Sequence, residues 1–352
     1  MKVAVLPGDG VGPEVTAQAV KVLRAVGHRF GHSFDVTTMP VGWAAIDEFG
    51  EPLPEATREA CRTSDAVFLG AVGLPDRDRT LPHEQRPERA ALLVLREGNF
   101  ANLRPIWLPR CMSAPGRPPV DILIFRELNS GIYMGGTRGR RTVDGVVEAF
   151  DTMRYSVPEI ERIAHMAFQA ARSRGKRVCS VDKANILATS VLWRETVEAV
   201  AAEYPDVSLR HQLADSATTR LVQKPQEFDV LLTGNLFGDI LSDLCGVLVG
   251  SLGMLPSASI GAKVGLFEPI HGTAPDIMGR DVANPVAAIL TMGMLLSHGL
   301  DLVEEADAVR AAVLSVLEGG YRTVDVMAQD CTQVGTTRFG DLVAGQIESG
   351  GA

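Results

Sequence analysis

The chain of 352 residues is long enough for two ordinary domains or one large one, and its 46% hydrophobic content is that of a globular protein. A net charge of −9 excludes nucleic acid as a general partner, because no basic field attracts phosphates. No apolar run reaches membrane-span length, no secretory signal is visible, and five cysteines without CxxC spacing indicate reduced thiols, so we expect a cytoplasmic protein without a membrane partner.

Short apolar runs alternate with longer helical patterns along the chain. The expected strands are 3–6, 66–69, 121–125, 178–181 and 229–233. One helix is expected over 14–26, and another after Ser156-Val-Pro-Glu159, which has the spacing of a capping box, with Gly175 as its stop. Strands that alternate with helices predict an α/β fold with a largely parallel sheet core, covered on both faces.

The segment Gly8-Asp-Gly-Val-Gly12 follows the first strand and precedes the first helix, as a dinucleotide-binding fingerprint does. Its third glycine comes one residue too early for G-x-G-x-x-G, and Pro13 follows at once. The pattern therefore favours a tight strand-to-helix turn over direct cofactor contact, and a classical Rossmann fold is not expected.

Two carboxylates, Asp239 and Asp243, lie four residues apart in Asn235-Leu-Phe-Gly-Asp-Ile-Leu-Ser-Asp243. In a helix this spacing places both on one face, about one turn apart. The apolar neighbours indicate a mostly buried helix, and buried acids need a partner. Carboxylate-only sites suit Mg²⁺ or Mn²⁺, so a metal site is favoured over two solvated acids.

Three arginines and two other side chains are candidates for binding and transforming an acidic substrate. Arg96, Arg104 and Arg126 each stand near the edge of an apolar element, and three converging guanidinium groups would hold a di- or tricarboxylic acid. Lys183 follows an apolar strand directly, where a lysine with a lowered pKa can act as a base. Taken singly, each of these residues, like Tyr133, also fits a structural or surface role.

Eight segments together resemble the metal-dependent β-decarboxylating dehydrogenases, a family that includes 3-isopropylmalate, isocitrate, homoisocitrate and tartrate dehydrogenases. They follow the family's order over nearly the whole chain: Gly8–Val15, Asn102–Pro105, Arg126–Tyr133, Ser180–Asn185, Asn235–Asp243, Leu255–Ser259, Glu268–Asp276 and Ala283–Pro285. Within the family the chain is most similar to the 3-isopropylmalate dehydrogenases.

The resemblance implies the two-domain fold of that family. One domain would combine residues 1–98 and 250–352 and bind the cofactor, and the other, 99–249, would provide the dimer contacts and the metal and substrate site. Members are homodimers, or tetramers built from dimers, and each active site is completed by the partner subunit.

The same resemblance implies a role for each polar candidate in the oxidation and decarboxylation of a 3-substituted malate. Asp239 and Asp243 would hold Mg²⁺ or Mn²⁺ together with Asp215 from the partner subunit. Lys183, also from the partner, would relay the proton of the 2-hydroxyl group, and Tyr133 would protonate C3 after CO₂ leaves. The three arginines would bind the substrate carboxylates.

The cofactor expectation depends on Asp276. In family members that use NAD, an acidic residue at this position accepts hydrogen bonds from the adenosine ribose, whereas NADP users place a lysine there. An aspartate would repel a 2′-phosphate, so the resemblance implies NAD. The rest of the expected cofactor pocket consists of His271, Gly272, Ala274, Asn284 and Asn185.

The substrate expectation depends on the segment 87–96, which should form a helix. Arg89, Leu92, Leu93 and Arg96 share one face by their 3–4–7 spacing. In the family this face meets the substituent on C3 of malate, and Leu92 with Leu93 would suit an isopropyl group. The implied reaction is the conversion of 3-isopropylmalate to 4-methyl-2-oxopentanoate (2-oxoisocaproate) in leucine biosynthesis.

Two departures from the family pattern leave alternatives open. Isopropylmalate enzymes usually carry glutamate where this chain has Arg89, and the segment from Arg96 to Arg104 is two residues shorter than usual. Homoisocitrate, isocitrate, tartrate or another malate with an anionic tail is therefore an alternative substrate, and a surface ion pair of Arg89 with Glu84 or Glu88 is the structural alternative. A non-catalytic regulatory subunit is a rival of another class, disfavoured because such subunits typically lose a metal aspartate, the lysine or the tyrosine.

Overall fold

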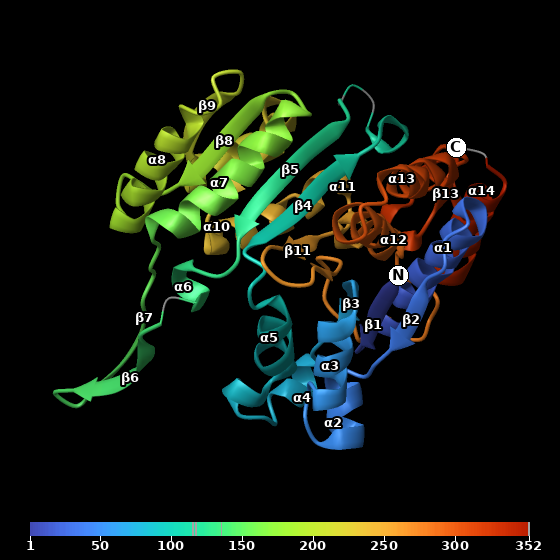
Figure 1. Cartoon of the computed structure of the whole chain (residues 1–352), viewed down its shortest axis with the longest axis horizontal. Coiled ribbons are helices and arrows are strands. Elements are labelled where there is room, and N and C mark those ends of the chain that lie inside the picture. The colour runs from blue at the N-terminus through green and yellow to red at the C-terminus, as the bar shows by residue number, and fades with distance from the viewer. Residues whose placement is uncertain (115, 117, 135, 351–352) are drawn as a thin grey trace. The chain divides into compact units, whose positions relative to one another are not determined.

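The computed structural model describes residues 1–114, 116, 118–134 and 136–350, and it divides the chain into two compact units (Figure 1). Unit 1 comprises Met1–Asn99, Pro109–Arg117 and Val249–Ala352. Unit 2 comprises Phe100–Leu108 and Pro118–Leu248. The separate roles expected for the two parts of the chain stay predictions.

Unit 1 contains both described chain ends and a sheet in the strand order β2-β1-β3-β12-β11. All neighbours in this order are parallel except β11 and β12, which run antiparallel. Helix α12 is buried along all of its residues, so it forms a core helix against which α1 and α13 pack. The described elements are β1 (Lys2–Gly8), α1 (Gly12–Phe30), β2 (Asp35–Thr38), α2 (Trp43–Phe49), α3 (Glu55–Thr63), β3 (Ala66–Ala71), α4 (Pro75–Asp78), α5 (Leu93–Arg96), β11 (Ala258–Ile260), β12 (Leu266–Phe267), α12 (Val286–Met294), α13 (Val303–Glu318), β13 (Tyr321–Arg322), β14 (Thr332–Gln333) and α14 (Thr336–Glu348).

Unit 2 contains a sheet in the order β4-β5-β10-β8-β9, in which only the β4–β5 pair is antiparallel. The mainly parallel order brings the C-terminal ends of β5, β8 and β10 to one edge, where the polar candidates follow. The described elements are β4 (Ala101–Leu108), β5 (Val120–Glu127), α6 (Gly131–Met134), β6 (Arg138–Val143), β7 (Val146–Asp151), α7 (Val157–Arg172), β8 (Arg177–Asp182), α8 (Ala188–Ala201), β9 (Ser208–Leu213), α9 (Ala214–Gln223), β10 (Val230–Thr233) and α10 (Asn235–Leu244), with α11 (Gly246–Val249) following.

The predicted α/β class with a largely parallel sheet is confirmed, as is each of the five predicted strands with small changes of boundary. The capping box is also confirmed, because the backbone N–H of Ser156 donates to the Glu159 carboxylate at 2.7 Å at the start of α7. The predicted stop at Gly175 is wrong. The helix already ends at Arg172, where the N–H of Ser173 turns back to the carbonyl of Ala170 at 3.2 Å.

The predicted helix over 87–96 is present over 88–96, but the expected regular spacing of its side chains is wrong. Glu88–Leu92 forms a π-helical turn, closed by a bond from the Leu93 N–H to the Glu88 carbonyl, and a single α-helical turn, α5, follows it. A π turn holds one residue more than an α turn. The 3–4–7 spacing that placed Arg89 on one face with Leu93 therefore does not apply across it.

The turn at Gly8–Gly12 has the tight form that its glycine spacing predicted. Gly10 has a φ of +60°, and a Cβ there would lie 2.0 Å from the Thr273 carbonyl oxygen. Asp9, which is buried, accepts backbone hydrogen bonds from Trp43 and Gly73, both at 2.8 Å. The turn therefore joins the first strand to the chain around Thr273, and its glycines serve close backbone packing.

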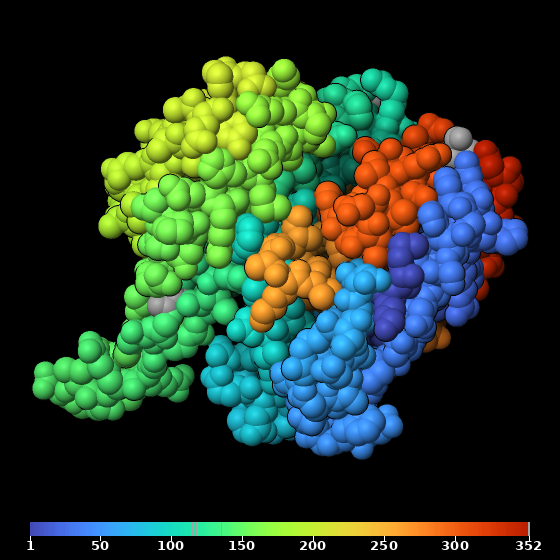
Figure 2. All heavy atoms as spheres, viewed as in Figure 1, coloured from blue at the N-terminus to red at the C-terminus, as the bar shows by residue number. Residues whose placement is uncertain are grey.

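The β6–β7 hairpin stands away from the rest of unit 2 (Figure 2). Every residue of both strands is exposed, including Val146, Val147 and Phe150. An isolated two-stranded hairpin is only marginally stable in water.

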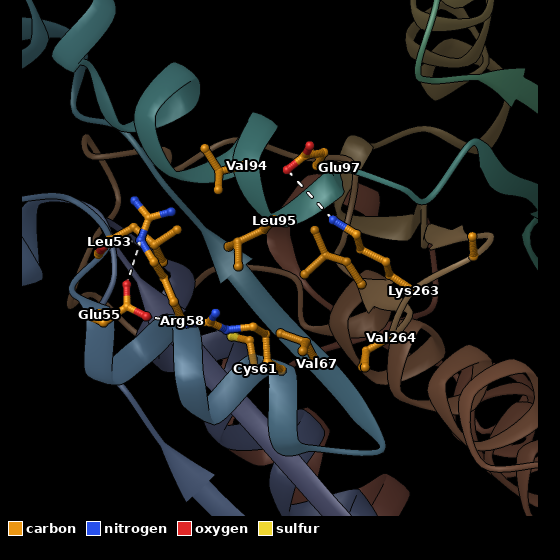
Figure 3. Close-up of a pocket in the computed structure, with 13 residues that line it drawn as sticks. Leu53, Glu55, Arg58, Cys61, Val67, Val94, Leu95, Glu97, Lys263 and Val264 are labelled. Carbon is orange, nitrogen blue, oxygen red and sulfur yellow. Dashed lines mark hydrogen bonds and ion pairs between the residues drawn. The ribbon is translucent and has the colours of Figure 1, made fainter.

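A cavity of about 680 Å³ lies in unit 1 between α3, α5 and the chain that leads into β12 (Figure 3). Its lining is mainly aliphatic, and burial raises the pKa of the Cys61 thiol there to about 11. The charged groups at its rim pair with one another, Arg62 with Glu55 and Lys263 with Glu97. Its described lining contains none of the candidate site residues.

Among the helices that the structure describes, none combines the length and the hydropathy needed to span a membrane.

Candidate active site

Helix α10 carries the acidic pair at the edge of the unit 2 sheet. It begins directly after β10, and its mostly apolar sequence buries one side while Asp239 and Asp243 lie one turn apart with 34% and 57% of their side chains exposed. The predicted helix and the common face of the two carboxylates are confirmed, whereas the expectation that the acids are buried is wrong, because both project from the exposed side of the helix. Two partly exposed carboxylates with hard oxygen atoms form a donor set that fits Mg²⁺ or Mn²⁺.

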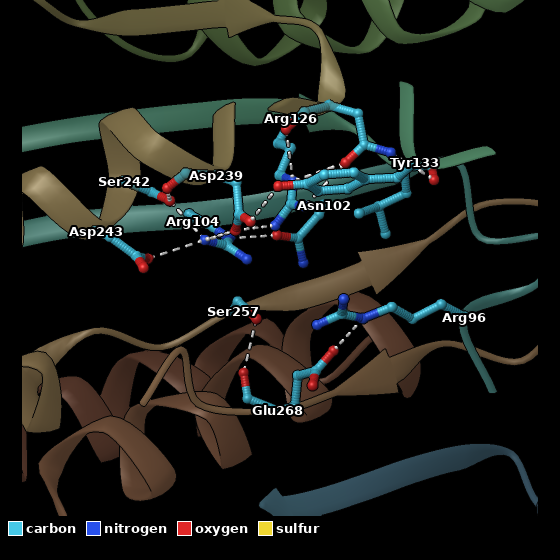
Figure 4. A network of polar contacts seen from close by, with 12 residues as sticks. Arg96, Asn102, Arg104, Arg126, Tyr133, Asp239, Ser242, Asp243, Ser257 and Glu268 are labelled. Carbon is cyan, nitrogen blue, oxygen red and sulfur yellow. Dashed lines mark hydrogen bonds and ion pairs between the residues drawn. The ribbon is translucent and has the colours of Figure 1, made fainter. Parts of the chain in front are cut away.

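Arg126 and Arg104 point at this acidic pair from neighbouring strands (Figure 4). Arg126 at the end of β5 donates from Nη1 to Asp239 Oδ1 at 2.5 Å. Nη1 of Arg104 on β4 lies 3.4 Å from Asp239 Oδ1 and 3.5 Å from Asp243 Oδ1. Both arginine side chains are almost fully buried, at 3% and 4% exposure, so their forks are held in place. The structure thus brings together two of the three predicted arginines.

Residues that the sequence reading did not single out fix these two forks. Asn235, the first residue of α10, accepts from Arg126 Nη2 with Oδ1 at 2.9 Å. Asn102 and Ser242 accept from Arg104, each at 2.5 Å. An asparagine near a substrate-binding arginine in the sequence is weak evidence that the two side chains contact each other, because the pairing of strands decides which groups meet.

The glycine inside α10 has a local reason. A Cβ at Gly238 would lie 2.6 Å from Cγ of Arg126, so only glycine leaves room for the arginine stem to pass the helix. Gly238 therefore leaves space for the Arg126 side chain, and the next residue, Asp239, is the carboxylate that Arg126 contacts.

Tyr133 in α6 completes the cluster. Its hydroxyl group lies 3.2 Å from Asp239 Oδ2, and the Arg126 guanidinium stands 5.8 Å from the centre of its ring. Burial, reinforced by the charge of Asp239, raises the pKa of Tyr133 above its usual value. Burial likewise raises the pKa of Asp243, which Arg104 partly opposes. The tyrosine is therefore protonated at neutral pH, as a proton donor must be.

Lys183 and Asp215 form a second polar group in unit 2. Lys183 directly follows β8, and its Nζ lies 2.8 Å from Asp215 Oδ1 in α9. This contact lowers the pKa of Asp215. Within the described residues, no three His, Cys, Asp or Glu side chains are grouped so that they could hold a metal ion. A single chain therefore does not assemble the predicted set of Asp215, Asp239 and Asp243.

Arg96, the third predicted clamp arginine, belongs to unit 1. It lies at the end of α5 and donates from Nε to Glu268 Oε1 at 2.7 Å (Figure 4). Glu268 is itself buried, so the pair is well shielded from water. The acid opens the Glu268–Asp276 segment, and this contact links the expected substrate arginine to the expected cofactor segment.

The expected adenosine-binding residues in unit 1 lie on two loops. His271 Nδ1 is 2.9 Å from the Gly272 carbonyl oxygen, and its buried Nε2 has no partner among the described atoms. Burial lowers the pKa of His271, so the ring is neutral at pH 7. Asn284 donates to Asp325 at 3.1 Å, an acid that the sequence reading missed.

The remaining predicted cofactor residues differ in exposure. Ala274 has a φ of +38°, and Gly272 and Asp276 are exposed near it in the chain. An exposed carboxylate such as that of Asp276 can accept hydrogen bonds from the hydroxyl groups of a ribose. Asn185 is exposed in unit 2, after Lys183.

Comparison with known proteins identifies the family of this site. The family model described as isocitrate/isopropylmalate dehydrogenase matches residues 2–343. The chain belongs to the isocitrate/isopropylmalate dehydrogenase family. It is therefore a decarboxylating dehydrogenase with the family's fold, and the prediction that it is an enzyme is confirmed.

Individual relatives extend this finding. The chain is 54% identical to a 3-isopropylmalate dehydrogenase of Nitratidesulfovibrio vulgaris over 356 residues, covering 99% of both chains. It is 51% identical to a protein of the same name from Prochlorococcus marinus, covering 97% of each. An isocitrate dehydrogenase structure from Methylococcus capsulatus matches with a TM-score of 0.88 at 34% identity, covering 99% of both chains. A β-decarboxylating dehydrogenase from Thermococcus kodakarensis matches at 0.80 and 37% identity, covering 99% of this chain and 96% of the other.

Proposed function

We propose that this family member oxidises and decarboxylates 3-isopropylmalate to 4-methyl-2-oxopentanoate with NAD and a divalent metal, as a step of leucine biosynthesis. The observation that carries the proposal is the cluster of Arg104, Arg126, Tyr133 and Asp239 in unit 2, which joins carboxylate binding, proton donation and metal binding. Full-length relatives at about half identity that are named 3-isopropylmalate dehydrogenase support the choice of substrate.

The chain's own residues divide the chemistry among them. Arg104 and Arg126 are buried forks that bind the substrate carboxylates and hold the 2-hydroxy acid in one orientation. Lys183 takes the proton of the 2-hydroxyl group as hydride leaves C2. Tyr133, kept protonated by its surroundings, returns a proton to C3 after CO₂ has left.

Asp239 and Asp243, with Asp215 of a second copy, would hold Mg²⁺ or Mn²⁺. When bound, the metal supplies Lewis acidity, which lowers the pKa of the substrate hydroxyl group and stabilises negative charge on the substrate oxygen.

We infer that NAD is the cofactor and that His271, Gly272, Ala274, Asn284 and Asp276 receive its adenosine part. The exposed Asp276 carboxylate suits ribose hydroxyl groups and repels a 2′-phosphate. Hydride acceptance is the chemistry that this cofactor supplies when bound.

We infer further that the protein is a cytoplasmic homodimer, or a tetramer of dimers, with shared active sites. Lys183 and Asp215 pair with each other, and the residues that the structure describes contain no group of three acids placed to hold a metal, which agrees with a site completed by a second copy. The exposed apolar side chains of the β6–β7 hairpin agree with a contact between copies. All five cysteines are free, as in a reducing compartment.

An anionic substrate tail is the second candidate, and the contacts of Arg89 disfavour it. Arg89 Nε donates to Glu84 at 2.9 Å, so its charge already has a partner on the surface. The π turn also removes Arg89 from the register that placed it beside Leu93. Leu93 is partly exposed, and Leu92 packs partly against the core of unit 1, which leaves an apolar side chain for an isopropyl group.

The proposal is tested by following NADH formation with Mg²⁺ and NAD. 3-Isopropylmalate should be turned over with a kcat/KM at least ~100-fold above homoisocitrate, isocitrate, tartrate and malate. The third carboxylate of homoisocitrate and isocitrate is costly to leave unpaired beside an apolar side chain, and tartrate and malate lack the apolar group that would contact it. NADP should support little turnover. A preference for any anionic analogue would overturn the choice of substrate but leave the reaction type standing.

A further inference from the structure

Glu127 is a buried carboxylate that the proposed chemistry does not use. It is the last residue of β5, directly after Arg126, and its side chain is completely shielded from solvent. Burying a carboxylate destabilises the folded state unless hydrogen bonds satisfy its oxygens, so the contacts of Glu127 are informative about its role.

Both carboxylate oxygens of Glu127 bind the backbone of the next turn. Oε1 accepts from the Asn129 N–H at 2.9 Å, and Oε2 accepts from the Ser130 N–H at 2.8 Å. A single side chain thus closes the three residues that lead from β5 into α6. Arg162 of α7 adds a contact to Oε1 at 3.2 Å.

The turn held by Glu127 connects Arg126 to Tyr133. Tyr133 is the third residue of α6, which begins at Gly131, directly after Ser130. The carbonyl groups of the turn are held as well, because Asn235 Nδ2 donates to Leu128 at 2.9 Å and to Ser130 at 3.1 Å. The N–H groups of the turn therefore bind Glu127 and its carbonyl groups bind Asn235, which restricts the conformation of the turn backbone.

We propose that Glu127 is a positioning residue, whose carboxylate holds the turn 128–130 so that the Tyr133 hydroxyl group stays beside Asp239 and over the substrate. The proposal rests on the proposed function, because Tyr133 matters only if it donates the proton to C3. A side chain without two acceptor oxygens would release one of the two N–H groups, and the tyrosine would lose its orientation.

The ionised form of Glu127 is the one that accepts both bonds. Burial raises its pKa to about 7, against the backbone bonds and Arg162, which lower it. Tyr155 is a further titratable group near this carboxylate: burial raises its pKa, and the charges of Glu127 and of Glu159 at the start of α7 raise it further. The carboxylate is thus ionised at pH 8 and takes up a proton below pH 7.

The test compares Glu127→Gln, Tyr133→Phe and the double variant in the dimeric enzyme with NAD and Mg²⁺. Glu127→Gln should lower kcat roughly 10- to 100-fold and change KM less than about threefold, because substrate binding by the arginines is retained. The double variant should be no slower than Tyr133→Phe within about twofold, because both changes remove the same proton transfer. Glu127→Asp, which keeps two acceptor oxygens, should recover part of the loss.

Two further readouts separate positioning from a general loss of structure. Exchange of the C3 protons of 4-methyl-2-oxopentanoate with solvent should slow in Glu127→Gln as it does in Tyr133→Phe. The ratio of wild-type to Glu127→Gln kcat should shrink as the pH falls below about 7, because the wild-type carboxylate then carries a proton too. Glu305→Gln, a change of a buried glutamate in α13 of unit 1, is the matched control and should leave kcat unchanged.

Defined outcomes would overturn the proposal. Losses that multiply in the double variant would show that Glu127 acts independently of Tyr133, and failure of both Glu127 variants to fold would give it a purely structural role. The substrate question is separate. If wild-type enzyme prefers another 3-substituted malate, the same comparison on that substrate still decides whether Glu127 acts through Tyr133.

Discussion

Arg126 and Asp239 are joined by a hydrogen bond of 2.5 Å between Nη1 and Oδ1, while Nη2 of the same guanidinium is held 2.9 Å from Asn235 Oδ1. A planar fork with several donors can serve both partners at once, whereas an ammonium group acts as a single point charge. This contact therefore orients the Asp239 carboxylate, which is proposed to hold the metal, and the Arg126 guanidinium, which is proposed to bind the substrate.

Replacing Arg126 by lysine should lower kcat/KM for 3-isopropylmalate by about 100-fold or more, since one ammonium group cannot keep both contacts in the buried site. Steady-state kinetics measure this loss. Arg172→Lys is the matched control: it changes an exposed pair with Asp206, and kcat/KM should stay within about twofold of wild type. Equal effects of the two changes would remove Arg126 from the substrate site.

Mixed dimers test whether active sites are shared. Lys183→Met and Asp239→Asn should each be inactive as homodimers. Exchange of subunits between them should restore about a quarter of wild-type activity, because half of the dimers are mixed and each has one complete site. Recovery is measured after refolding the two variants together, with each refolded alone as the control. No recovery would place Lys183 and Asp239 in the same site of one chain.

Glu127 should make the stability of the protein depend on pH. Its folded-state pKa of about 7 lies above the ordinary value of 4.5, so the fold favours the protonated form and loses that stabilisation as the pH rises through 7. Glu127→Gln cannot ionise. Its unfolding free energy relative to wild type should therefore improve by roughly 3 kcal/mol between pH 4.5 and pH 8. Urea unfolding at the two ends of this range measures the change, and a pH-independent difference would contradict it.

Arg89 should have little influence on substrate choice. Its partner Glu84 is 72% exposed, and ion pairs of this kind contribute little. Arg89→Ala should change kcat/KM for 3-isopropylmalate less than about threefold. Leu93→Ala should lower the same quantity about tenfold, by removing apolar contact with the isopropyl group. Assays of both variants with homoisocitrate complete the test, since loss of its residual turnover only in Arg89→Ala would make Arg89 a substrate ligand.

Much of the fold and of the site could be predicted from local patterns. The strands and α7 follow from hydrophobic periodicity, and the capping box at Ser156 and the acidic pair at Asp239 and Asp243 follow from fixed spacings within one helix. Periodicity failed at 87–96, because a π turn is a single inserted residue that no average spacing reveals. The same regular spacing had placed Arg89 on the face of Leu93.

The sequence by itself determined the family, the α/β class and the residue types that the reaction needs, because these are carried by short motifs whose spacing is independent of distant chain. Only the tertiary structure decided which groups contact one another. Asn235 meets Arg126, Glu127 closes the turn before Tyr133, and Arg96 pairs with Glu268 across 172 positions of sequence. Such contacts depend on the order of the strands in the sheet and on how side chains pack past one another. Neither property produces a periodic pattern in the amino-acid sequence.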